Sequence, residues 1–262
     1  MAHIATIYRY PIKGLSPELL PQTTLTPGQT VTGDRLYAIE NGPSSFDPIA
    51  RPYLPKTHFL MLMKNERLAR LRCTFDHESH VLAIEPPATA AELGGGLSWD
   101  RVVRGDLRTA DGRAAVEKFF AVFCADELRG PPKILHAPGH SFSDIASKVV
   151  SIINLASVAA IEGLVGVPVN PLRFRGNVYV DGWPAWSELD LVGKELTIGT
   201  ARLKVVKRIV RCAATDVDPD TGLRDLQIPK TVMSAFGHAD CGIYAEVRQG
   251  GEIAVSREVT IS

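Results

Sequence analysis

One cysteine of this sequence stands where it could do chemistry. Cys212 follows Arg211 directly after an expected strand, Leu203 to Val210, and a turn-rich acidic stretch comes next. Positive charge beside a thiol favours the thiolate, which is both a nucleophile and a soft metal ligand. The commoner role of a single cysteine is that of a small buried apolar residue. The strand-end position beside arginine favours a functional role here.

The acidic stretch after this cysteine has some of the spacing of a calcium loop. Asp216, Asp218 and Asp220 alternate as the first ligands of an EF-hand do. However, the glycine comes one position late, at Gly222, and the twelfth position is Gln227 instead of glutamate. We therefore reject calcium and expect Asp side chains to close the loop by hydrogen bonds to its backbone.

Two basic residues near the N-terminus stand at expected turns. Lys13 precedes Gly14, which permits close backbone approach, after a predicted strand Ile4 to Tyr10. Arg35 follows Gly33-Asp34, and its guanidinium group fits a phosphate or a carboxylate. On residue type alone, a surface lysine in a turn and an ordinary Asp/Arg surface pair are the commoner interpretations.

A third basic stretch, Arg173-Phe174-Arg175-Gly176-Asn177, precedes another expected strand. Two arginines two positions apart lie on the same face of an extended chain. Together with Asn177 they could cradle an oxyanion or a polar heterocycle. A solvated strand edge is the alternative, but two like charges on one face repel, so a bound anion is at least as good an explanation.

His238 and Cys241 could be interpreted as a nucleophilic pair. They stand three positions apart in an expected loop-to-strand segment, a spacing that does not ensure contact. We therefore favour a structural role for Cys241. Hydrolase, NTPase and Rossmann interpretations lack support, because no nucleophile elbow, P-loop or dinucleotide-binding glycine motif is present.

The elements that must position these residues are mainly short strands, separated by Gly, Pro and Asp turns. We expect hairpin turns at three places: residues 76–79, Gly199-Thr200 and Gly250-Gly251. Helical spacing predicts two helices, at 114–125 and 155–165, with Asp111 and Asn154 as start signals. This mixture predicts a mainly β fold with a few helices (α+β), built from barrels rather than from a βαβ sheet.

Composition narrows the class of protein. The chain has 262 residues, 45% of them hydrophobic, which is enough for a core without disulfides. Its 29 basic and 29 acidic residues balance, so nucleic acid and anionic membranes are not expected partners, and anion binding must come from local clusters. The four cysteines form no CxxC pair, and neither a signal peptide nor an apolar membrane span is recognisable. We expect a soluble, cytoplasmic protein with reduced thiols.

These stretches together resemble a known family. Residues 149–261 resemble the MOSC domain, the C-terminal domain of molybdenum cofactor sulfurases, through three motifs: residues 173–177, 211–222 and 237–245. Residues 2–138 resemble the β-barrel domain that precedes MOSC in this family, through residues 10–14 and 33–35. We therefore expect two domains, 1–138 and 139–262.

The resemblance implies a MOSC β-barrel, a smaller N-terminal β-barrel domain, and a molybdenum cofactor (molybdopterin) in the cleft between them. A cysteine in the family's Arg-Cys motif ligates molybdenum, and it matches Cys212. Seven further residues match positions that the resemblance implies bind the cofactor, namely Lys13, Gly14, Arg35, Arg173, Arg175, Asn177 and Arg211. Of these, Lys13 and Arg35 match the residues that contact its phosphate. The chemistry agrees, because phosphate suits lysine and arginine, and the metal prefers soft sulfur.

Relatives such as the amidoxime reducing component reduce N-hydroxylated compounds, so the resemblance implies a molybdenum-dependent oxidoreductase. Asp216 could relay protons to a reducible N–O group. The sequence ends at Ser262 without the cysteine cluster of a ferredoxin domain, so we expect electrons from a separate ferredoxin- or cytochrome-type protein. The alternatives are a non-enzymatic carrier of cofactor or sulfur, with a persulfide on Cys212, and a binding domain whose site has decayed. The physiological substrate, the electron donor and the oligomeric state are left open.

Overall fold

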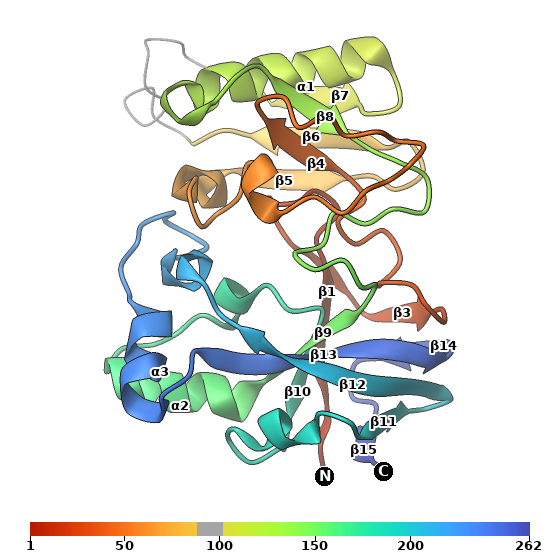
Figure 1. Cartoon of the computed structure of the whole chain (residues 1–262), viewed down its shortest axis with the longest axis vertical. Coiled ribbons are helices and arrows are strands. Elements are labelled where there is room, and N and C mark those ends of the chain that lie inside the picture. The colour runs from red at the N-terminus through yellow and green to blue at the C-terminus, as the bar shows by residue number, and fades with distance from the viewer. Residues whose placement is uncertain (88–101) are drawn as a thin grey trace.

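The computed structural model describes residues 1–87 and 102–262, which form two lobes, one above the other in Figure 1. Strands dominate both lobes, and three α-helices are present in the described ranges. The α+β fold class predicted from the sequence is confirmed. The N- and C-termini lie close together at the lower end of the molecule (Figure 1).

The lower lobe is built on a sheet of eight strands in the order β15-β11-β12-β13-β9-β10-β1-β2. These strands are β1 (His3–Arg9), β2 (Glu18–Leu20), β9 (Val150–Asn154), β10 (Val178–Asp181), β11 (Glu195–Ile198), β12 (Ala201–Val210), β13 (Asp240–Gln249) and β15 (Thr260–Ile261). The segment before β15 returns to the start of β1, where Ile4 N donates to Arg257 O at 2.9 Å and Val259 N donates to Ala2 O at 2.9 Å. The sheet therefore curls round until its two ends meet, and fully buried aliphatic side chains fill its interior.

A pair of short strands, β3 (Gln22–Leu25) and β14 (Gly251–Ala254), extends the lower lobe. The hairpin that Gly250-Gly251 predicts between β13 and β14 is therefore wrong, because β14 pairs with β3 and β13 pairs with β12 and β9. The predicted turns at 76–79 and Gly199-Thr200 do join antiparallel neighbours. The first joins β5 (Arg72–Phe75) to β6 (Val81–Glu85), and the second joins β11 to β12.

The upper lobe contains a three-stranded sheet and a strand pair under one long helix. The elements are β4 (Ala38–Asn41), β5 (Arg72–Phe75), β6 (Val81–Glu85), β7 (Val103–Asp106), α1 (Ala110–Phe123) and β8 (Pro132–Leu135). Helix α1 buries Val116, Phe119, Phe120 and Phe123 in a second hydrophobic core. It begins before the predicted helix because the Thr109 side chain, and not Asp111, caps it by accepting from Gly112 N.

Two helices pack beside the lower sheet, α2 (Leu155–Val165) and α3 (Ile228–Phe236). Helix α2 has the bounds that the sequence predicts, and Asn154 caps it by accepting from Ala156 N at 3.0 Å. Helix α3 was not predicted. None of the helices in the described ranges is long and apolar enough to cross a membrane.

Strand pairing crosses the expected division between residues 138 and 139. Strand β1 lies between β10 and β2 in the lower sheet, and β3 pairs with β14 near the C-terminus. Strands β1, β2 and β3 therefore belong to the lower lobe (Figure 1), whereas Ile12 and Leu15, between β1 and β2, pack in the core of the upper lobe. Two of the connections between the lobes, residues 26–37 and 136–149, contact each other, because Phe142 N donates to Arg35 O at 2.9 Å.

Candidate functional site

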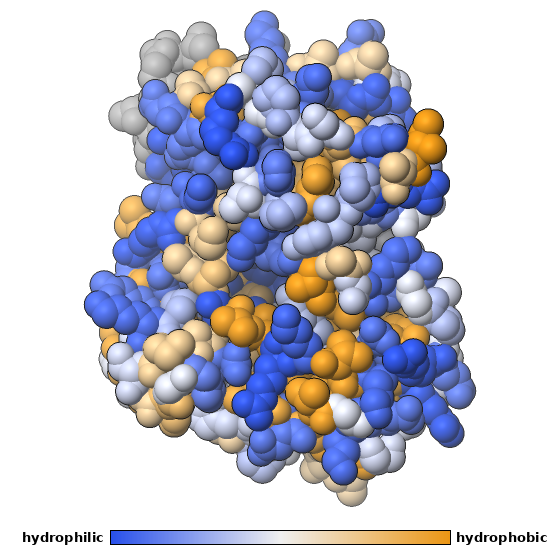
Figure 2. All heavy atoms as spheres, in the orientation of Figure 1, coloured by the Kyte–Doolittle hydropathy of each residue, from blue (hydrophilic) through white to orange (hydrophobic). Residues whose placement is uncertain are grey.

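A pocket of about 240 Å³ lies between the two lobes. Eight of the nine predicted site residues line it, namely Lys13, Gly14, Arg35, Arg173, Arg175, Asn177, Arg211 and Cys212. They come from four separate stretches of the chain, which the fold brings together as the sequence motifs predicted. Figure 2 shows this face of the molecule, hollowed where the upper and lower lobes meet.

The pocket is strongly basic although the whole chain is neutral. Eight basic side chains line it, which are Lys13, Arg35, Lys56, Arg173, Arg175, Lys207, Arg208 and Arg211. Only two acidic residues, Asp34 and Asp144, line it as well. Such a local excess of positive charge attracts anionic ligands even where the net charge of the protein is zero.

Cys212 stands at the end of β12, where the extended chain turns into a short 3-10 helix, Ala213–Asp216. Its side chain is half-buried, and Lys56 Nζ donates to its Sγ at 3.2 Å. Burial lowers the pKa of Lys56, but Asp144 and Cys212 together raise it above its ordinary value, so this ammonium group stays charged. Lys56 lies on a 3-10 helix, Lys56–His58, and sequence reasoning missed it because nothing near it in the chain marks a site.

We expect Lys56→Met to change which reagents reach Cys212. A fixed positive charge at 3.2 Å draws an anionic reagent toward the sulfur, so removing it should slow alkylation by iodoacetate about three- to tenfold relative to neutral iodoacetamide. Mass spectrometry of the Cys212 peptide measures both rates. Lys64→Met, at an exposed lysine outside the pocket lining, is the matched control and should leave the ratio unchanged. An unchanged ratio in Lys56→Met would contradict the contact.

Arg211 holds the end of β12 in place. Its Nε donates to Cys241 O at 2.7 Å, its Nη1 donates to Phe174 O at 2.9 Å, and its guanidinium lies 5.3 Å from the Phe174 ring centre. Its Nη2 is buried and has no hydrogen-bond partner in the described part of the chain. A Cβ at Gly242, where φ is +82°, would lie 3.0 Å from this nitrogen and 2.6 Å from Ile152 O, so this position requires glycine.

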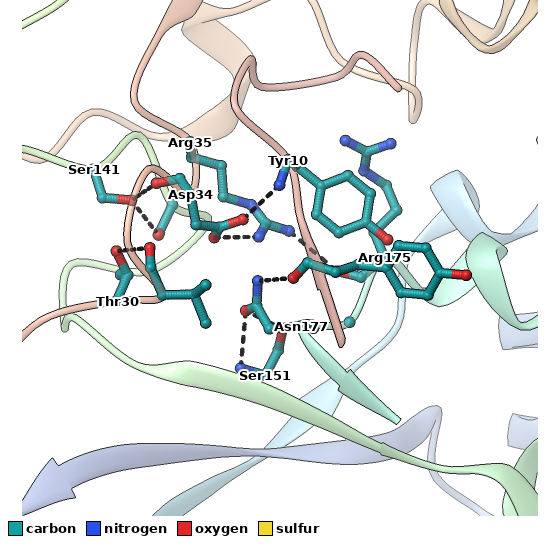
Figure 3. Close-up of polar contacts among 12 residues, drawn as sticks. Tyr10, Thr30, Asp34, Arg35, Ser141, Ser151, Arg175 and Asn177 are labelled. Atoms are coloured by element: carbon teal, nitrogen blue, oxygen red, sulfur yellow. Dashed lines mark hydrogen bonds and ion pairs between the residues drawn. The ribbon is translucent and has the colours of Figure 1, made fainter. Parts of the chain in front are cut away.

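A second group of polar side chains surrounds Tyr10 at the base of the upper lobe (Figure 3). Asp34 accepts from Tyr10 N at 2.8 Å and pairs with the Arg35 guanidinium. Arg35 Nη2 also donates to Arg175 O at 3.1 Å. Burial alone would lower the pKa of Arg35, but the Asp34 carboxylate more than offsets this and raises it. Arg35 is therefore a fixed positive charge whose position is set by its neighbours.

Arg175 is a half-buried cation of this pocket, and none of the ion pairs in the described ranges gives it an anion. Its backbone is left-handed, with φ at +49°, and its guanidinium lies 4.1 Å from the Tyr10 ring centre. Its guanidinium donates to Leu15 O at 2.9 Å. Burial lowers its pKa. A half-buried guanidinium with unused N–H groups is suited to an anionic ligand.

Arg173 and Asn177 line the pocket, but most of their side-chain polar atoms form hydrogen bonds with other residues of the protein. The extended conformation predicted around Arg173 is wrong, because Pro171–Phe174 form a 3-10 helix. Arg173 is 4% exposed and donates to Asp218, to both carboxylate oxygens of Asp225 and to Asp216 O. Arg173 therefore braces the acidic loop.

Asn177 joins three strands beneath the pocket. Its Oδ1 accepts from Ser151 N at 3.2 Å and from Ser151 Oγ at 2.8 Å, and its Nδ2 donates to Tyr8 O at 3.2 Å (Figure 3). These contacts connect the start of β10 with β9 and β1.

Asp216 is the predicted site residue that does not line the pocket. Its Oδ1 accepts from Ile228 N at 2.8 Å, so it caps the first turn of α3. Burial raises its pKa. The acidic loop closes as expected, because Asp218 Oδ1 accepts from Asp220 N at 3.0 Å and from Thr221 N at 2.7 Å.

In the described part of the chain, no hydrogen bond, ion pair or ring contact joins His238 to Cys241. Cys241 is 1% exposed in the core beside α2 and α3, and burial raises the pKa of its thiol to about 12. His238 Nδ1 accepts from Asp240 N at 3.1 Å, and its ring stacks on Phe236. The structural role expected for Cys241 agrees with this burial.

Lys13 and Asp144 form an ion pair at the wall of the pocket. Lys13 is 4% exposed, and its Nζ donates to Phe142 O at 2.8 Å and to the Asp144 carboxylate. Burial lowers the pKa of Lys13, and Asp144 opposes that effect. Burial would raise the pKa of Asp144, but Lys13 and Lys56 hold it well below its usual range. The sequence motifs did not indicate Asp144.

Gly14, next to Lys13, adopts a φ of +84°, and a Cβ there would lie 3.1 Å from Leu60 O. Any side chain would therefore strain the backbone and crowd the wall of the pocket.

Comparison with known proteins places a family domain over the second half of the chain. Residues 136–260 match the model of the MOSC domain. The chain is 30% identical over 122 residues to "Mitochondrial amidoxime reducing component 2" of Bos taurus, covering 42% of this chain and 36% of that protein. It is 32% identical over 89 residues to "Mitochondrial amidoxime-reducing component 1" of Homo sapiens, covering 34% of this chain and 26% of that protein. The matches thus span about a quarter to a third of these relatives.

Two solved structures are similar over different extents. The YuaD protein from Bacillus subtilis aligns with 100% of this chain and 96% of its own, at 14% identity and a TM-score of 0.44. YiiM from Geobacillus stearothermophilus aligns with 43% of this chain and 53% of its own, at 23% identity and a TM-score of 0.34. Both TM-scores are low, so the fold described above rests on the strand pairing of this chain itself.

Proposed function

We propose that the protein binds a pterin-based molybdenum cofactor in the pocket between its lobes, because residues 136–260 match the model of the MOSC domain. We propose further that it is an oxidoreductase that reduces N-hydroxylated compounds. The observation that carries the proposal is the position of Cys212, a half-buried thiol at the edge of a pocket with eight basic side chains.

The donor set of the pocket fits such a group. A phosphate requires buried or half-buried cations, and Lys13, Arg35 and Arg175 offer them in this pocket. A soft metal requires sulfur, and Cys212 offers it in the same pocket. Arg175 has no anion of its own in the described ranges, which is the feature a bound phosphate would complete.

Each residue has a distinct task in this proposal. Cys212 would hold the metal, and Lys13, Arg35 and Arg175 would hold the phosphate, while Arg211 fixes the strand end that carries the cysteine. The bound cofactor would supply the two-electron redox centre. Reduction of an N–OH group to N–H consumes two electrons and two protons, breaks the N–O bond and releases the oxygen as water.

The electrons need an external source, for which we propose a separate ferredoxin- or cytochrome-type protein. Two relatives are named for amidoxime reduction, which supports this class of substrate.

The proton relay first expected at Asp216 has less support, because that carboxylate caps α3 and does not line the pocket. Lys56, at 3.2 Å from the sulfur, is better placed to contact a substrate. A cytoplasmic location stays a prediction.

Elemental analysis of protein from a cofactor-producing host tests the proposal. We expect about one molybdenum per chain, together with reduction of an aromatic amidoxime when reduced methyl viologen replaces the natural donor. Molybdenum without amidoxime reduction would restrict the protein to cofactor binding. Absence of molybdenum would reject the oxidoreductase and favour the alternative, a sulfur carrier with a persulfide on Cys212, which mass spectrometry detects as one added sulfur.

A further inference from the structure

The connection from β8 to β9 brings a carboxylate into the basic pocket. Residues 143–145 of this connection line the pocket, and Asp144 is the one that carries charge. Its carboxylate accepts a hydrogen bond from Lys13, and its Oδ2 lies 3.9 Å from Lys56 Nζ. One acidic side chain thus contacts two of the cations that face the pocket.

The two members of the main pair differ in exposure. The Lys13 side chain is 5% exposed, whereas that of Asp144 is 47% exposed. A buried ammonium group needs a compensating partner, because leaving a charge unpaired in the interior is costly. Asp144 reaches Lys13 from the solvent side, so the carboxylate can move into water, but Lys13 cannot.

The segment around Asp144 is fixed at its ends and irregular between them. Phe142 N donates to Arg35 O at 2.9 Å, and the Phe142 ring packs edge-on against Phe59. Lys148 Nζ donates to Gln29 Oε1 at 2.7 Å and so fixes the other end. Residues 143–147 belong to no helix or strand. Between these ends Tyr53 Oη donates to Asp144 O at 2.7 Å, so the backbone of Asp144 is held as well. The carboxylate would therefore leave Lys13 by rotation of the Asp144 side chain, a local change that moves neither lobe.

We propose that Asp144 is a specificity-determining residue of this pocket, whose carboxylate occupies the position of an anionic ligand and competes with it for Lys13 and Lys56. A phosphate monoester carries nearly two negative charges and three acceptor oxygens, so it satisfies both lysines better than one carboxylate does. A ligand with a single carboxylate gains little by replacing Asp144. The pocket is thereby selective for phosphate over simpler anions. This inference rests on the proposed function, because it takes the ligand of this pocket to carry a phosphate.

Calorimetric titration of cofactor-free protein with inorganic phosphate and with pyrophosphate tests the competition. We expect Asp144→Asn to bind both about tenfold more tightly than the unchanged protein, since the ligand no longer displaces a charge-assisted hydrogen bond. The affinity for acetate should increase in Asp144→Asn by at least the same factor. The ratio of the phosphate affinity to the acetate affinity should therefore not increase. Asp126→Asn, at an exposed carboxylate outside the pocket lining, should change neither affinity.

Melting temperatures of the variant and the unchanged protein, with and without phosphate, distinguish a change in binding from a loss of folding. Asp144→Asn removes the partner of a buried lysine, so its melting temperature without ligand should fall, and added phosphate should restore it. Asp144→Ser provides a second variant if the asparagine protein is poorly folded.

Equal affinities in the variant and the unchanged protein would overturn the competition while leaving the proposed function standing, because molybdenum content is measured separately. Weaker binding by Asp144→Asn would also overturn it, since Asp144 would then help to form the binding site.

Discussion

Cys212→Ala is expected to abolish both molybdenum retention and amidoxime reduction. Loss of residues that only orient a metal ligand costs 10- to 100-fold in metal affinity, so loss of the ligand itself should cost at least about 100-fold. The change should leave the fold intact, because the Cys212 side chain is half-buried at the pocket and belongs to none of the hydrophobic cores. Metal analysis and activity with an artificial reductant measure the two effects.

Cys73→Ala is the matched control for this prediction. Cys73 is also half-buried, but it lies on β5 in the upper lobe and does not line the basic pocket. This variant should keep its molybdenum and its activity. Full molybdenum content in Cys212→Ala would show that another group holds the metal.

Arg173→Met is expected to destabilise the protein by about 2 to 4 kcal/mol. Breaking a buried ion pair typically costs about 3 to 5 kcal/mol, and the partial exposure of its partners, 20% for Asp218 and 46% for Asp225, reduces that figure here. The guanidinium side chain itself is 2% exposed. For a chain of this size the loss should lower the melting temperature by roughly 5 to 10 °C. Thermal and urea unfolding measure it.

A neighbouring ion pair on the same loop provides the control. Arg72 contacts Asp220 at 3.3 Å, with side-chain exposures of 55% and 66%. Arg72→Met should therefore cost less than about 1 kcal/mol, because exposed pairs contribute little. If Arg173→Met and Arg72→Met lower the free energy of unfolding by the same amount, the burial of Arg173 is not the cause of its contribution to stability.

Local signals in the sequence predicted the elements whose geometry is decided locally. Asn154 caps α2 because its side chain reaches Ala156 N two residues away, and such a contact needs no other part of the fold. The turn at Gly250-Gly251 was as clear a local signal, yet the predicted hairpin was wrong. Strand β14 pairs with β3, more than 200 residues earlier in the chain. A local sequence pattern cannot predict a partner strand that lies so far away in the chain.

The same distinction separates the site residues that were predicted from those that were not. Arg211 and Cys212 stand in a motif that can be recognised within a few residues. Lys56 stands in a short 3-10 helix and Asp144 in an irregular segment, and both reach the pocket because the two lobes meet there. The role expected of Asp216 depended on its closeness to Cys212 in the chain, and the unpredicted helix α3 engages its carboxylate instead.

The position of β1 also has a consequence for how the chain is made. Its Ile4 pairs with Val180, and Ile4 N donates to Arg257 O, so both partners are synthesised long after β1 itself. At about 5 to 20 residues per second, the wait until Val180 is synthesised is roughly 10 to 35 s. During this time the contacts of the upper lobe, which are closer together in the sequence, can form first. A strand that is synthesised early is therefore among the last to find its place, and the nascent chain carries an unpaired apolar edge that chaperones can bind.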